Sequence, residues 1–236
     1  DTLTWTGTFN SGGKLVKTGP GDLYLNNINA NKFLLSDGID INNGRIRFKT
    51  GDWYKNPFGG TRTITINAGG IGVIERSHAW GVENHHFHVN GGALVLNQSQ
   101  YMRSGSQMTG GEISGSDQLR FWGNKLLTVN AASETAVISC SLNLVGSTPD
   151  RLDVADGAAD PDLLISGTVY NAGGLRKLGN GKLVLNGTCT YANSTTIEAG
   201  TLGGTGSTVS DTTVWTGATL APGVTGPGVF PVNNDL

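Results

Sequence analysis

The sequence predicts an all-β protein, more specifically a parallel β-solenoid of about ten coils. Three observations lead to this prediction: short stretches in which apolar and polar residues alternate, small turn residues that recur at intervals of 20 to 25 positions, and 37 glycines among 236 residues. The glycine content is roughly double the usual share of about 7%. No stretch has a convincing helical period. The best candidate for a short helical turn is residues 155–164, which Pro161 interrupts.

The expected strands are short and have one apolar face. The alternating stretches include Ile64-Thr65-Ile66, Phe87-His88-Val89 and Leu127-Thr128-Val129. A period of two residues places every second side chain on the same face of a strand, so each of these stretches can bury one face in a core.

The expected corners follow these strands. Turn positions recur at Gly44, Gly69, Gly91, Gly111 and Ala131, with gaps of 25, 22, 20 and 20 residues. This spacing fits one coil of a solenoid per repeat. Glycine suits a corner because it accepts positive φ, and stacked coils allow Thr and Asn side chains to form ladders. A Greek-key sandwich is the alternative, since parts of the sequence also fit its strand spacing of 8 to 12 residues.

A longer repeat recurs 160 positions apart. Residues 17–26 (KTGPGDLYLN) return as residues 177–186 (KLGNGKLVLN), and a Gly-Gly pair precedes each copy. The shared pattern places a tight glycine corner before a strand whose leucines face inward.

Residues 173–187 and 195–202, with the glycine-rich sequel at 203–206 and 217–223, resemble the autotransporter-associated β-strand repeat, also called the passenger-associated transport repeat. The resemblance extends over residues 165–236 and 10–48 and is weak between them. It implies a right-handed parallel β-helix in large secreted bacterial surface proteins, and hence an extracellular or cell-surface location. It indicates architecture and export rather than chemistry.

We expect residues 1–236 to form one solenoid domain that is a segment or repeat unit of a longer array or fibre. The segment 1–7 is echoed by 211–217, with identity at five of seven positions. Open solenoid ends expose unpaired strand edges. The expected partners are therefore neighbouring repeats or copies of the chain itself, joined end to end by a non-closing contact.

Charge and hydropathy argue against two classes of partner. The net charge is -2 and charged residues make up 14% of the chain, whereas a nucleic-acid-binding protein needs a basic face. No apolar run approaches the ~20 residues of a membrane span.

Two clusters are candidate metal ligands. All four histidines lie between positions 78 and 88, and His86 and His88 would share one face of a strand, within reach of a zinc or nickel ion. The acidic run at 150–162 offers Asp153 and Asp156 as oxygen ligands for calcium. Neither spacing matches an established metal motif. We therefore favour the interpretation that both clusters are polar residues at coil corners, and we expect no cofactor.

Aromatic and cysteine residues leave alternatives open. Trp53, Tyr54 and Phe58 lie in one inserted loop and suit contacts with sugars or proteins, unless the loop folds back and buries them. Cys140 and Cys189 could form a disulfide if the coils bring them together, or could be small buried residues.

We identify no catalytic constellation and predict that the protein is not an enzyme. Its expected function is structural, as a stalk, filament unit or adhesin. A carbohydrate-binding adhesin module that contacts surface glycans is the first alternative. A polysaccharide lyase or glycoside hydrolase is the second, and its paired carboxylates cannot be identified in the sequence.

Overall fold

The computed structural model describes residues 1–5, 13–26, 35, 37–49, 62–77, 85–206 and 211–223. Throughout this part of the chain the structure is all-β and contains no helix, and the strands form three parallel sheets. Strands adjacent in a sheet come from successive passages of the chain, which is the order that a solenoid produces. The Greek-key alternative is therefore wrong, because a sandwich would pair its strands in antiparallel fashion.

The largest sheet has eleven strands. In spatial order they are β1 (Thr2–Trp5), β3 (Asp22–Leu25), β5 (Gly44–Phe48), β7 (Gly70–Ile74), β9 (Ala93–Leu96), β12 (Glu112–Ser114), β15 (Ala136–Ile138), β18 (Leu163–Ile165), β21 (Lys182–Leu185), β24 (Thr201–Gly204) and β26 (Thr219–Pro222).

The second sheet has ten strands and the third has five. The ten-stranded sheet contains β2 (Leu15–Lys17), β4 (Ile39–Ile41), β6 (Arg62–Asn67), β8 (His85–Asn90), β11 (Ser106–Thr109), β14 (Leu126–Val129), β17 (Asp150–Val154), β20 (Leu175–Leu178), β23 (Thr195–Ile197) and β25 (Thr212–Val214). The five-stranded sheet contains β10 (Gln100–Tyr101), β13 (Gln118–Phe121), β16 (Ser141–Leu144), β19 (Val169–Asn171) and β22 (Cys189–Tyr191).

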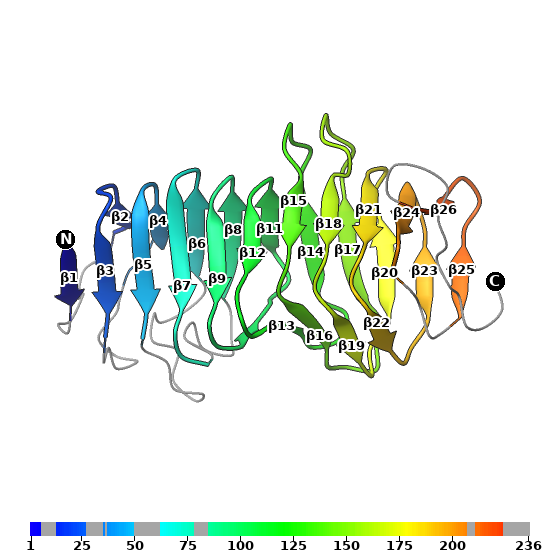
Figure 1. Cartoon of the computed structure of the whole chain (residues 1–236), viewed down its shortest axis with the longest axis horizontal. Helices are drawn as coiled ribbons and strands as arrows, with labels where there is room; N and C mark the ends of the chain where they lie inside the picture. The colour runs from blue at the N-terminus through cyan, green and yellow to red at the C-terminus, as the bar shows by residue number, and fades with distance from the viewer. Residues whose placement is uncertain are drawn as a thin grey trace.

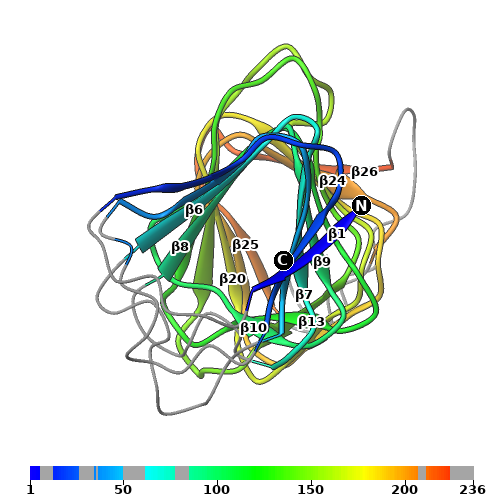
Figure 2. The same ribbon diagram turned by 90° about the vertical axis from the view of Figure 1, so that its left-hand side faces the viewer.

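The chain winds as a right-handed solenoid. Strands of the eleven-stranded sheet run down the front in Figure 1, and strands of the ten-stranded sheet return behind them. The view along the axis in Figure 2 shows the sheets surrounding a common interior. The expected count of about ten coils is slightly off. The coils are also not uniform. The described sheets contain eleven, ten and five strands, so only part of the solenoid has three sides.

The core consists of the apolar residues that alternate along the strands. Ile64 and Ile66 in β6 and Phe87 and Val89 in β8 are buried, whereas the residues between them are more exposed. Equivalent residues stack, since Ile64 pairs with Phe87 and Ile66 with Val89 in the parallel register. Each inward side chain therefore contacts neighbours from the coils before and after it, which confirms the predicted period of two.

Four of the five expected corners have the conformation that favours glycine. Gly44, Gly69, Gly91 and Gly111 have φ of 70°, 86°, 71° and 73°. Ala131 differs, because its corner lies in a longer connection, residues 130–135, which joins β14 to β15. This connection and the one between β17 and β18 project beyond the other corners (Figure 1).

The candidate helical turn at residues 155–164 is not helical. Its first part connects β17 to β18 and its last part enters β18. Hydrogen bonds to the side chain of Asp162, rather than helical hydrogen bonds, fix this connection. The buried Asp162 carboxylate accepts bonds from the Gly157 amide at 2.7 Å and the Lys182 amide at 2.8 Å.

Candidate functional site

The two copies of the long repeat each place a lysine ammonium at a glycine corner. Lys177 is fully buried on β20. Its Nζ donates hydrogen bonds to the carbonyl oxygens of Leu178 at 2.9 Å, Gly179 at 2.7 Å and Ala199 at 3.2 Å. Burial lowers the pKa of Lys177 from 10.5 to about 8. The ammonium thus satisfies backbone acceptors of two successive corners.

Lys17 has the equivalent role in the first copy. Its Nζ donates to the carbonyl oxygen of Gly19 and to that of Asn43 at 3.1 Å. Sequence reasoning emphasised the glycines and leucines of the repeat and missed the lysine. The available signal was a lysine two residues before the first corner glycine in both copies.

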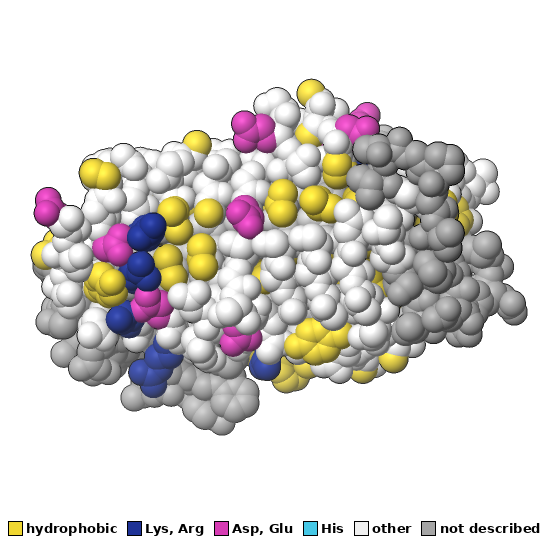
Figure 3. Space-filling view, in the orientation of Figure 1, with side chains coloured by type: hydrophobic (Ala, Val, Ile, Leu, Met, Phe, Trp, Pro, Cys, Tyr) yellow, Lys and Arg dark blue, Asp and Glu magenta, His cyan; other side chains and the backbone are white. Residues whose placement is uncertain are grey.

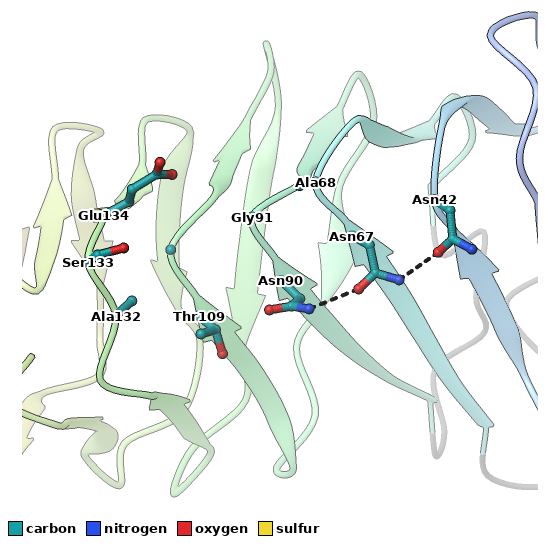
Figure 4. Close-up of a pocket in the computed structure, with 10 residues that line it drawn as sticks. Asn42, Asn67, Ala68, Asn90, Gly91, Thr109, Ala132, Ser133 and Glu134 are labelled. Carbon is teal, nitrogen blue, oxygen red and sulfur yellow. Dashed lines mark hydrogen bonds between the residues drawn. The ribbon is translucent and has the colours of Figure 1, made fainter.

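An open groove of about 520 Å³ crosses several coils on the described surface. Figure 4 shows asparagine side chains stacked along one side of it. The Asn67 amide nitrogen donates to Asn42 Oδ1 at 2.7 Å, and the Asn90 amide nitrogen donates to Asn67 Oδ1 at 2.9 Å. This asparagine ladder confirms that stacked coils align polar residues, and it leaves a shallow polar surface rather than an enclosed site.

Charged side chains gather on the outward face of β3, β5 and β7. The guanidinium of Arg47 donates to Asp22 at 2.7 Å and to Glu75 at 2.6 Å, and Lys49 pairs with Glu75 at 3.2 Å. In Figure 3 the basic and acidic residues are intermingled at the N-terminal end of the solenoid. The hydrogen bond from Arg47 lowers the pKa of Asp22. The charges neutralise one another across three coils, as expected of a structural network.

The histidines lie on β8, apart from His78, which is outside the described residues. His86 and His88 share the outward face as expected, and the ring Nε2 of His88 lies 3.3 Å from the Gly105 carbonyl oxygen. His85 faces inward, and burial lowers its pKa to about 4. The described residues contain no group of three or more metal-binding side chains. The interpretation of His86 and His88 as polar corner residues, rather than zinc or nickel ligands, stays a prediction.

The aspartates of the acidic run make different contacts and do not act as one group. Asp160 pairs with Lys182 at 2.7 Å, Asp162 fixes the connection described above, and Asp150 lies at the start of β17. Asp153 points outward from β17 and Asp156 lies in the following connection. Within the described chain these aspartates form no clustered ligand set. The interpretation of Asp153 and Asp156 as polar corner residues, rather than calcium ligands, stays a prediction.

The buried carboxyl group of Asp150 makes the free energy of unfolding depend on pH. Its carboxylate is fully buried and accepts one hydrogen bond, from the Lys125 amide at 2.7 Å. Burial raises its pKa from 3.8 to about 6, so the folded state binds this proton more tightly than the unfolded state. The stabilisation is complete below pH 3.8 and is lost as the pH rises through about 6, by a total on the order of 3 kcal/mol. Urea unfolding at several pH values should show this loss in the wild type relative to Asp150→Asn. Parallel stability curves for the two proteins would contradict it.

The structure describes both cysteines but not the aromatic loop. Cys140 and Cys189 are free and buried, so the disulfide is absent and the alternative of two small core residues is correct. Burial raises the pKa of the Cys140 thiol to about 12, which makes it unreactive. Trp53, Tyr54 and Phe58 lie outside the described residues.

Taken together, the fold and its polar groups define a parallel β-solenoid whose best-built features are corner caps, amide ladders and ion-pair networks. In the described part of the chain there is no helix long and apolar enough to cross a membrane.

Comparison with protein families agrees with this class. The passenger-associated-transport-repeat model matches residues 15–47 and 175–203, and each match contains one of the lysine-capped corners. Two segments of the chain are thus similar to the passenger-associated transport repeat. No curated protein and no solved structure matches it.

Proposed function

We propose that this chain is a structural, non-enzymatic β-solenoid of a secreted or cell-surface bacterial protein, in which it serves as a stalk or filament segment. The observation that carries the proposal is the pair of parallel sheets, with eleven and ten strands, that run the length of the described solenoid. Continuous backbone ladders along one axis resist bending and leave few open segments for proteases. The name of the matched repeat supports export.

The ends of the sheets support an end-to-end partner. Among the described strands, β1 and β26 are the outer strands of the eleven-stranded sheet, and β2 and β25 those of the ten-stranded sheet. Large apolar side chains are exposed near both ends, with Leu3 at 61% and Trp215 at 51%. Pairing with a neighbouring repeat or a second copy would cover these edges.

Electron microscopy of the purified chain tests both points. We expect stiff rods of uniform width that join end to end as the protein concentration rises. Compact, isolated particles at high concentration would contradict end-to-end pairing, and flexible strings would contradict the structural role.

Carbohydrate binding is a second candidate function. It is favoured by an exposed tryptophan, Trp122, that directly follows β13 and contacts the ring of Tyr101.

A further inference from the structure

The outward face of β13 presents three different side chains in a row. Along this strand Leu119 and Phe121 are buried in the core. Gln118, Arg120 and the following Trp122 alternate with them and lie on the outside. Trp122 is 54% exposed, which makes it one of the most exposed large apolar residues in the described chain. We call Gln118, Arg120 and Trp122 the β13 row.

Neighbouring side chains hold the aromatic and cationic groups of the β13 row in place. The ring of Tyr101 on β10 contacts the Trp122 ring at a centroid distance of 5.6 Å and an angle of 44°. The guanidinium carbons of Arg103 and Arg120 lie 5.9 and 5.7 Å from the Tyr101 centroid. Cation–π contacts of this kind fix a guanidinium without neutralising its charge.

Among the described residues, no carboxylate forms an ion pair with Arg120. The Nε of Arg120 has no hydrogen-bond partner among these residues. The strands of the five-stranded sheet contain no acidic residue. The nearest acid in sequence is Asp117, whose Oδ1 accepts a hydrogen bond from the backbone N–H of Gln118 at 2.8 Å. The described residues therefore make this face locally cationic, whereas the net charge of the chain is -2.

An amide ladder orients the third member of the β13 row. Gln118 Oε1 accepts hydrogen bonds from Asn143 Nδ2 at 2.6 Å and from the hydroxyl of Tyr170, and Asn171 Nδ2 donates to Asn143 Oδ1 at 2.8 Å. Because the Gln118 oxygen is engaged by two donors, the Nε2 group is left as the donor at the end of the ladder.

We propose that the β13 row binds an acidic polysaccharide. Trp122 offers a ring face for a sugar ring, Arg120 a guanidinium for a uronate carboxylate or a sulfate, and Gln118 an amide hydrogen for a sugar hydroxyl. The inference rests on the second candidate function and specifies its site and ligand class. It is independent of the structural role, which the rods in electron micrographs test separately.

Calorimetric titration of the whole chain with polygalacturonate tests the proposal, with neutral dextran as the comparison ligand. We expect the wild type to bind polygalacturonate and not dextran, with an affinity that falls as salt is added. Trp122→Ala and Arg120→Gln should each weaken binding by about tenfold or more. Arg120→Lys should recover part of the loss, because it restores the charge but not the planar fork.

Matched controls keep the test specific. Trp215→Ala removes a tryptophan that is 51% exposed at the C-terminal end of the ten-stranded sheet, and Arg45→Gln removes an exposed arginine of β5. Both should bind within about twofold of the wild type, and all variants should keep its melting temperature. Failure of the wild type to bind polygalacturonate, equal binding to dextran, or equal loss in the two controls would overturn the proposal.

Discussion

Replacing Gly181 with valine is expected to lower the free energy of unfolding by about 3 kcal/mol or more. A Cβ atom at this position would lie 2.4 Å from the Ala155 carbonyl oxygen and 2.8 Å from Asp162 Oδ2. The Gly181 amide also donates to the Val154 carbonyl oxygen at 2.8 Å. Neighbouring coils therefore leave no room for a side chain here, and the backbone would have to move.

Lys182→Ala is the matched control for this experiment. The Lys182 ammonium pairs with Asp160, whose side chain is 74% exposed, so its loss should cost less than about 1 kcal/mol. Urea unfolding of the two variants measures the difference. Equal midpoints would show that coil spacing at this corner does not depend on glycine.

Loss of the buried ammonium at Lys177 is the second large effect. Lys177→Met keeps the aliphatic length of the side chain but leaves the carbonyls of Leu178, Gly179 and Ala199 without their donor. Buried acceptors without a partner cost about 1–3 kcal/mol each when no water replaces the donor. We therefore expect the variant to be less stable than the wild type by several kcal/mol at pH 7.

The pH dependence separates the charge of Lys177 from its packing. Its pKa is about 8 in the folded state against 10.5 otherwise, so between these values the unfolded state binds more protons. Stability from this group therefore rises as the pH increases from 8 to 10.5. Cys140 and Tyr191 act in the opposite direction, because burial raises the pKa of both groups. The advantage of the wild type over Lys177→Met should thus grow with pH, and a constant difference would contradict the assignment.

The sequence predicted the parts of the fold that repeat. Strand alternation such as Ile64-Thr65-Ile66 and corner glycines such as Gly91 have periods that follow directly from geometry. The asparagine ladder follows from the same stacking, although the pairing of Asn42, Asn67 and Asn90 required the register.

Other features depended on contacts that periodicity does not contain. Lys177 and Asp150 read as ordinary polar residues, yet both are fully buried, because their neighbours are set by the stacking of coils about 20 to 25 residues apart. The β13 row was missed for a related reason. Its three members alternate in a short strand, but their chemistry becomes visible only beside Tyr101 and Asn143 from the adjacent coils.

The order of the sheets has a mechanical consequence. Because each coil is bonded mainly to the coils before and after it, tension applied to the two ends should unravel the molecule lap by lap, beginning at an extremity. A lap of 20 to 25 residues, the spacing of the turn positions, would release about 65–90 Å of slack at about 3.3–3.6 Å per residue. Under tension the molecule would therefore lengthen in steps of one coil instead of unfolding in a single event.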